Sequence, residues 1–139
     1  MQATIDRKLS ICVPMCTHNL ADLRWRAWSY LTAAGVASGM VEDILIALHE
    51  AVANAIRHSS SCSDVVVCLR TSRRRVTVEV KDEGVGLPVW VALPPGPPDP
   101  HAEGGRGLYM IWALMSSVRL ASSPGTHLVM TKELFPPHA

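Results

Sequence analysis

The segment from Ser38 to His58 carries a repeating apolar pattern that fits a long helix. When successive residues are placed about 100° apart, its apolar side chains fall within about 60° of one direction. These side chains are Val41, Ile44, Leu45, Leu48, Val52, Ala55 and Ile56. The chain must therefore fold so that one long helix buries a face against an apolar layer.

Two pairs of strand-like segments supply such a layer. Residues 64–71 and 75–81 are rich in β-branched side chains, and residues 117–122 and 126–134 flank the turn Pro124-Gly125. Short connections of this kind join antiparallel hairpins. The other expected elements are a strand over residues 9–16, a helix from Asn19 to Gly35, and a helix that follows the glycines at 104–107.

This order of elements predicts an α+β fold, a two-layer α/β sandwich in which helices cover one face of a mixed sheet. The chain has 139 residues, a length that suits one domain. We expect a single domain over residues 1–139, with its core over about residues 9–134. The composition, 48% hydrophobic and 18% charged, excludes a disordered chain.

Charge and hydropathy narrow the possible partners. The net charge is +1, whereas proteins that bind nucleic acid through phosphates normally have a clear basic excess. We therefore expect no direct nucleic-acid binding, although the cluster at residues 73–75 leaves a local basic patch open. The apolar run at residues 11–15 is far shorter than a signal peptide or a membrane span, so we expect a cytoplasmic protein without membrane contact.

The four cysteines do not have the spacing of a metal site. Cys12, Cys16, Cys62 and Cys68 form no C-x-x-C pair. Reduced thiols on strands or strand edges are the expected state, with a zinc site or a disulfide as the alternative.

The polar face of the long helix carries the first functional pattern. Glu50 points directly away from the apolar face, and Asn54 and Arg57 follow it along the same side. Ala47 and Ala53 lie near Glu50, and such small side chains leave room for a ligand. An ordinary solvated helix face would show a similar polar pair.

The second pattern is Asp82-Glu83-Gly84-Val85-Gly86, placed where a strand ends. Alternating glycines let the backbone pass close to a ligand, and a carboxylate can accept hydrogen bonds from a ligand amine. The alternative is a plain turn, because Asp and Gly are common turn residues.

The third pattern follows a long proline-rich loop. Six of the ten prolines lie between Gly86 and Gly104, so we expect a lid-like loop over about residues 87–103. After it, Gly104-Gly105-Arg106-Gly107-Leu108 begins a helix, where free N–H groups and the helix dipole favour an anion such as phosphate. A flexible hinge is the alternative.

In this order the three patterns resemble the N, G1 and G2 boxes of the GHKL (Bergerat-fold) ATPase superfamily, which includes gyrase, heat-shock protein 90, histidine kinases and MutL. Within it, the short chain, the segment at residues 48–58 and the ending Ser122-Ser123-Pro124-Gly125-Thr126 resemble the small anti-sigma-factor serine/threonine kinases of the RsbW and SpoIIAB type. The resemblance covers about residues 9–134 and implies a histidine kinase-like ATPase domain.

The resemblance implies a role for each matching position. Glu50 would be the general base, Asn54 would hold Mg²⁺ between the ATP phosphates, and Asp82 would read adenine. The other implied nucleotide-binding residues are Gly84 and Gly86 beside the base, Gly104, Gly105, Arg106, Gly107 and Leu108 around the phosphates, and Thr126 near the adenine. The proline-rich lid departs from the more regular lid that is usual in this family, which puts nucleotide closure in question.

The implied function is that of an ATP-binding anti-sigma factor and protein serine/threonine kinase. It would phosphorylate an anti-anti-sigma (STAS-type) partner, hold a sigma factor, and form a homodimer. Arg24 and Arg26 on the first helix are the implied partner-binding residues, with solvated surface charges as the alternative. Rival functions are a non-catalytic ATP-gated binding module and, more remotely, a detached ATPase domain.

Overall fold

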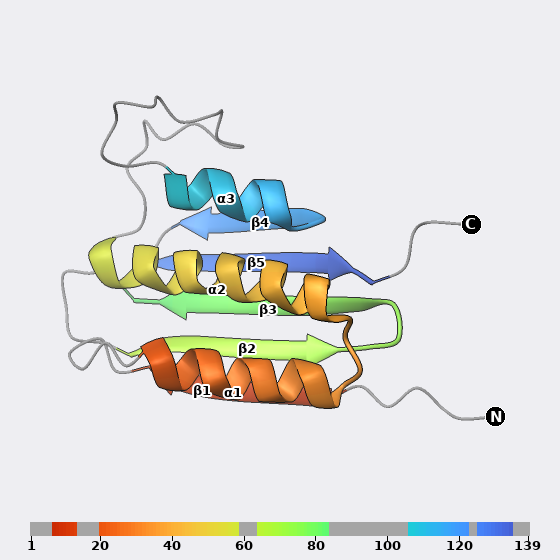
Figure 1. Cartoon of the computed structure of the whole chain (residues 1–139). Helices are drawn as coiled ribbons and strands as arrows, with labels where there is room; N and C mark the ends of the chain where they lie inside the picture. Colours follow the sequence, from red (N-terminus) through yellow and green to blue (C-terminus); the bar gives the residue numbers. More distant parts are fainter. Residues whose placement is uncertain (1–6, 14–19, 59–63, 84–105, 123–124, 135–139) are drawn as a thin grey trace.

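Three helices cover one face of a five-stranded sheet in the computed structural model of the chain (Figure 1). The structure describes residues 7–13, 20–58, 64–83, 106–122 and 125–134. Its elements are β1 (Arg7–Val13), α1 (Leu20–Ala33), α2 (Ser38–His58), β2 (Val65–Thr71), β3 (Arg75–Asp82), α3 (Arg106–Leu114), β4 (Ser117–Ser122) and β5 (Thr126–Glu133). The expected α+β class and the helical layer on one face are confirmed.

The strand order is β1-β2-β3-β5-β4, and all the pairings among these strands are antiparallel. The expectation of a mixed sheet was therefore wrong in this detail. β3 and β4 do run in the same direction, as their arrows show in Figure 1. However, β5 returns from the β4 hairpin into the gap between them and pairs with both.

Buried and more exposed side chains alternate along the strands, and the buried ones lie on the face of the sheet that packs against the helices. In β2 and β3, every second side chain is buried, and these include Val67, Leu69, Val78 and Val80. The register aligns Val67 with Val80 and Val80 with Leu128, so apolar side chains form continuous rows across the sheet. Burial of such rows is the main favourable contribution to folding.

The central helix α2 is buried on more than one side. Its expected apolar face is inside, but Ala47 and Ala51, outside the expected core set, are also 0% and 3% exposed. The reason is that α3 packs against α2 on the side away from α1. The small side chains at these positions therefore permit close approach of another helix, whereas Ala47 had been expected to leave room for a ligand.

The helices α1 and α2 end within two residues of the positions expected from the sequence. Gly35, which follows α1, has a φ of 85°, a conformation that glycine adopts without steric cost. Within the described residues, none of the helices combines the length and apolar character needed to cross a membrane. The expected lid over residues 87–103 lies outside the described residues.

Candidate functional site

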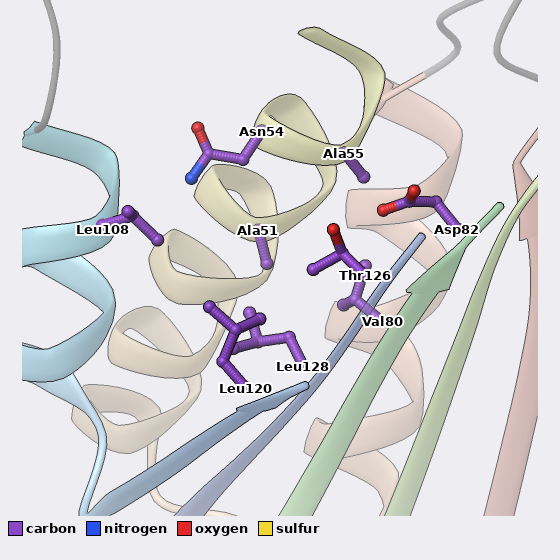
Figure 2. A pocket seen from close by; sticks show the side chains of 9 residues that line it. All are labelled: Ala51, Asn54, Ala55, Val80, Asp82, Leu108, Leu120, Thr126 and Leu128. Atoms are coloured by element: carbon purple, nitrogen blue, oxygen red, sulfur yellow. The ribbon is translucent and has the colours of Figure 1, made fainter. Parts of the chain in front are cut away.

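A pocket of about 340 Å³, partly open to solvent, lies between α2, α3 and the sheet (Figure 2). Val80, Leu120 and Leu128 form its apolar floor, and Figure 2 shows the polar atoms of Asn54, Asp82 and Thr126 above this floor. Ala51, Ala55 and Leu108 complete the lining. A mostly apolar lining with a few polar groups is typical of small-molecule sites.

Asp82 is placed in this pocket by the alternation of β3. It follows Val78 and Val80 on the inward face, so its carboxylate is carried into the site and is only 5% exposed. The sheet register aligns Asp82 with Thr126, which places the carboxylate and the hydroxyl on neighbouring strands. A buried carboxylate beside a hydroxyl can accept hydrogen bonds from an amine and distinguish one base from another.

Gly125 supports the Asp82 end of β3. Its φ is 70°, and a Cβ atom built on it would overlap the backbone carbonyl oxygen of Asp82 and lie 3.0 Å from the Cα atom of Glu83. Only a residue without a side chain lets the β4–β5 turn approach β3 so closely. The turn thereby fixes the backbone that carries Asp82.

Glu50 and Asn54 meet the first turn of α3. A Cβ atom on Gly107 would lie 2.7 Å from Oε1 of Glu50 and 3.7 Å from both polar atoms of the Asn54 amide. Glu50 and Asn54 are half-buried and one turn apart on α2. The N-terminus of α3, which carries partial positive charge, is therefore next to a carboxylate and an amide.

Lys132 holds α3 in this position. Its Nζ atom donates to the carbonyl oxygen of Leu114, the last residue of α3, and lies 3.1 Å from Oδ2 of Asp43 on α2. A lysine at a helix C-terminus interacts favourably with the helix dipole. One side chain of β5 thus links both helices that form the site.

The oxygen atoms at this site allow binding of a metal ion that the protein and a ligand coordinate together. Nη1 of Arg57 donates to Oδ1 of Asn54 over 3.0 Å, and this amide oxygen has a second lone pair that a metal ion can use. Among the described residues, no cluster of three or more His, Cys, Asp or Glu side chains could hold a metal ion. Mg²⁺ is commonly held by one or two protein oxygens together with substrate phosphates and waters, which fits this arrangement.

The predicted site residues divide into three groups. Asn54, Asp82, Leu108 and Thr126 line the pocket, while Glu50 and Gly107 lie beside Asn54. Arg24 and Arg26 are exposed on α1, on the other side of α2 from α3. Gly84, Gly86, Gly104 and Gly105 lie outside the described residues, as does the side chain of Arg106.

Sequence reasoning missed several parts of the site. It did not find the apolar floor, although Leu120 and Leu128 share the inward register of Val80. It treated Gly125 only as a turn residue, and its contact with β3 depends on a pairing that is distant in sequence. The alternation from Val76 to Asp82 was the signal that could have shown that Asp82 points inward.

Known proteins share this sequence and arrangement. A protein-family model described as "Histidine kinase-like ATPase domain" matches residues 14–132. The chain belongs to the histidine kinase-like ATPase family. The resemblance expected from the three sequence patterns is thus confirmed.

Individual relatives in this family are serine-protein kinases. The serine-protein kinase RsbW of Bacillus subtilis is 33% identical over 120 residues, which cover 75% of each chain. RsbW of Listeria monocytogenes serotype 4a is 27% identical over 140 residues, covering 94% of this chain and 89% of the relative.

A solved structure shares the fold. The RsbU and RsbW domains of a Mycobacterium tuberculosis protein superpose with a TM-score of 0.70 at 23% identity. The match covers 92% of this chain but only 32% of that longer chain.

Proposed function

We propose that this protein is an ATP-dependent protein serine/threonine kinase and anti-sigma factor of the RsbW type. The observation that carries the proposal is the meeting of Glu50, Asn54 and Gly107 beside the pocket that contains Asp82. This arrangement brings together the proposed base, the proposed metal ligand, the helix end proposed for phosphate and the carboxylate proposed for adenine. The chain is also similar in sequence to named serine-protein kinases over most of its length.

We place the adenine base of ATP in this pocket. A flat base would lie on Val80, Leu120 and Leu128, while the Asp82 carboxylate accepts a hydrogen bond from the exocyclic amine and Thr126 lies beside it. Guanine has a carbonyl oxygen where adenine has this amine, so Asp82 would reject it. We also place Gly84 and Gly86 beside the base.

The phosphates would extend from the pocket toward the N-terminus of α3. Backbone N–H groups at Gly104, Gly105, Arg106, Gly107 and Leu108 are the proposed donors. Asn54 would hold Mg²⁺ through Oδ1, in competition with the hydrogen bond that Arg57 donates to that oxygen. Bound Mg²⁺ neutralises charge that develops on the transferred phosphoryl group.

Glu50 is the proposed general base. Its carboxylate lies next to the helix end where the terminal phosphate would sit, so a serine hydroxyl of a partner could be held between them. The hydroxyl proton passes to Glu50, the serine oxygen forms a bond to the γ-phosphorus, and the bond to the β-phosphate oxygen breaks. The products are phosphoserine on the partner and ADP.

The proposed partners are an anti-anti-sigma (STAS-type) protein, which is phosphorylated, and a sigma factor, which is held. Arg24 and Arg26 on α1 are the proposed partner-binding residues. The protein would act as a cytoplasmic homodimer, without direct contact with nucleic acid or membrane.

A second candidate is a non-catalytic module in which ATP gates a protein interaction. The observation that favours it is that Glu50 does not line the pocket, so nucleotide binding does not require the candidate base.

The test is incubation of the protein with γ-radiolabelled ATP, Mg²⁺ and an anti-anti-sigma protein of the same organism, followed by phosphoamino-acid analysis. The proposal predicts label on serine or threonine of the partner. ATP binding without any transfer would instead support the binding module.

A further inference from the structure

Lys132 is a charged side chain at a position where the alternation of β5 favours an apolar one. Leu128 and Met130 precede it on the same inward row and are buried, and the register pairs it with the fully buried Val76. The side chain of Lys132 is only 16% exposed. Burying a charge costs free energy unless it is paired, and residues that break a local pattern in this way are expected at functional positions.

The ammonium group of Lys132 contacts both helices of the site. Its Nζ atom lies 3.1 Å from Oδ2 of Asp43 on α2 and donates to the backbone carbonyl oxygen of Leu114 at the end of α3. Carbonyl groups at a helix C-terminus have no partner within the helix and carry partial negative charge. One cation therefore satisfies the end of α3 and the Asp43 carboxylate together, and this fixes the end of α3 relative to α2.

One stripe of α2 faces α3. Its members follow each other at spacings of four, three and four residues, which places them on one side of the helix: Asp43, Ala47, Glu50 and Asn54. Leu114 is linked to Asp43 at one end of this stripe through Lys132, and Gly107 lies against Glu50 near the other end. The two helices thus run antiparallel, with a contact at each end of α3.

The two contacts are separated by the same length on both helices. Glu50 follows Asp43 by seven residues, and Leu114 follows Gly107 by seven residues. At a rise of about 1.5 Å per residue, each interval is about 10.5 Å long. A movement of α3 along α2 that broke the contact of Lys132 would therefore displace Gly107 from Glu50 by a similar distance.

The apolar contacts of α3 fix its position along its own axis less strictly. Ile111 is fully buried, and Leu108 and Trp112 pack against the core. Apolar burial is non-directional, whereas a hydrogen bond weakens outside a narrow range of distance and angle. The backbone N–H of Ser116 donates to the carbonyl oxygen of Thr131 over 2.7 Å, but this bond ties the chain after α3 to β5 and not to α2. Lys132 thus supplies a directional contact between the end of α3 and α2.

We infer that Lys132 is a positioning residue for the phosphate groups of ATP. The inference rests on the proposed function, which places the phosphates at the N-terminus of α3, and it goes beyond that function by naming the residue that holds this helix in place. Lys132 does not line the pocket, and Leu108 is the lining residue that α3 contributes. The base is therefore held mainly by α2 and the sheet. Lys132 should affect phosphate binding and transfer and leave binding of the base unchanged.

The test compares three variants at this contact. Lys132→Met removes the ammonium and keeps an unbranched apolar stem, Asp43→Asn removes the charge of one acceptor, and Lys132→Arg retains a cation with several N–H donors. Calorimetry of Lys132→Met should show affinity for ATP reduced about tenfold and affinity for adenosine changed by less than about twofold. Asp43→Asn should give a smaller loss of the same kind, and Lys132→Arg should keep ATP affinity within about threefold of the wild type.

Two controls separate positioning from general stability. Arg75→Met removes the cation of an ion pair with Glu133, on the outer face of the sheet, and Ser116→Ala removes the acceptor of a backbone N–H at the same end of α3. Neither should change the ratio of ATP affinity to adenosine affinity. Urea denaturation gives the stability of every variant. A Lys132 that serves only stability would lower the two affinities together and leave their ratio at the wild-type value.

A second readout follows the transfer step. Lys132→Met should slow single-turnover transfer to the anti-anti-sigma protein by about 10–10² at saturating ATP, because a misplacement of about 1 Å can cost about 10² in rate. Lys132→Arg should restore most of this rate.

The two proposals can fail separately. An unchanged ratio of ATP affinity to adenosine affinity in Lys132→Met would overturn the inference, and the kinase function would stand if the wild type still phosphorylates its partner. If the ratio falls but the wild type transfers no phosphate, the inference stands and the kinase function fails. If Lys132→Met does not fold, the same ratio in Asp43→Asn decides. No binding of ATP by the wild type would contradict both proposals.

Discussion

Two carboxylates at the site, those of Asp82 and Glu50, have different surroundings and different proposed roles. Asp82 is almost fully buried at the end of β3, where a fixed position suits recognition of a base. Glu50 is half-buried beside Gly107, where it can meet both a phosphate and an incoming hydroxyl. Substitutions should therefore separate nucleotide binding from transfer.

Asp82→Asn should weaken ATP binding by about 1.5–3 kcal/mol, because a charge-assisted hydrogen bond is lost and an amide donor can then face the adenine amine. Calorimetry with ATP and GTP measures the change. Glu79→Gln is the control, since Glu79 lies on the opposite face of the same strand. Equal affinity of the wild type for ATP and GTP would remove Asp82 from this role.

Arg57→Ala should lower the Mg²⁺ concentration that gives half-maximal ATP binding. Arg57 donates to Oδ1 of Asn54, the oxygen proposed for the metal, so its guanidinium competes with and repels a cation there. Loss of one such hydrogen bond, worth about 0.5–1.5 kcal/mol, corresponds to a shift of about two- to tenfold. Magnesium titrations at fixed ATP, with Arg70→Ala as a charge-matched control, check this. A higher Mg²⁺ requirement would indicate that Arg57 contacts a phosphate instead.

At the scale of elements, the site depends on how closely α3 approaches α2. Gly107→Ala would place a Cβ atom 2.7 Å from Oε1 of Glu50, so the flexible carboxylate must move. A misplacement of about 1 Å can slow a reaction by about 10². We expect slower transfer by about 10–10², with the free energy of unfolding changed by less than about 1 kcal/mol.

Gly39→Ala is the matched control for this prediction, because Gly39 is also a helical glycine but has open space around its Cα atom. Initial rates of partner phosphorylation and urea denaturation provide the two measurements. Normal transfer by Gly107→Ala would mean that the observed position of Glu50 is not the one used in the reaction.

The β4–β5 turn should be equally sensitive at Gly125. Both Gly125→Ala and Gly35→Ala force a left-handed conformation on alanine, which costs about 1–2 kcal/mol. Gly35 has no neighbouring atom in the way, whereas Gly125 lies against the Asp82 backbone. Urea denaturation should show a larger loss for Gly125→Ala by at least about 1 kcal/mol, together with weaker ATP binding. Equal losses would show that the contact with β3 is not required.

Most elements of the fold could be predicted because their causes are local. The apolar period of Ser38–His58 and the alternation of Val76, Val78 and Val80 specify a helix and a strand by themselves. The pairing of β5 with β3 could not be predicted in this way, since residues 84–105 and two further elements separate the strands. Burial of Ala47 likewise depends on a helix that comes much later in the chain.

The whole molecule places nucleotide binding and partner binding, as proposed above, on opposite sides of α2. The pocket that contains Asp82 lies on the α3 side, and the proposed partner-binding residues Arg24 and Arg26 lie on α1, on the other side. The sequence could indicate Glu50, Asn54 and Asp82 because their residue types and order resemble a family pattern. It could not show that Gly107 touches Glu50 or that Trp25 and Trp28 are exposed, because both depend on helix packing.

Glu50→Ala tests the central claim, that this fold transfers phosphate and does not only bind ATP. Removing a positioned base should slow partner phosphorylation by about 10²–10⁴ and leave ATP affinity within a few-fold. Asn54→Ala should impair Mg²⁺-dependent ATP binding as well, and Glu42→Ala, an exposed acid on the same helix, should change neither. The direct measurement is the single-turnover rate of label transfer from γ-radiolabelled ATP to the anti-anti-sigma protein. A strongly reduced rate at normal ATP affinity is the predicted result, and an undiminished rate in Glu50→Ala would contradict the mechanism.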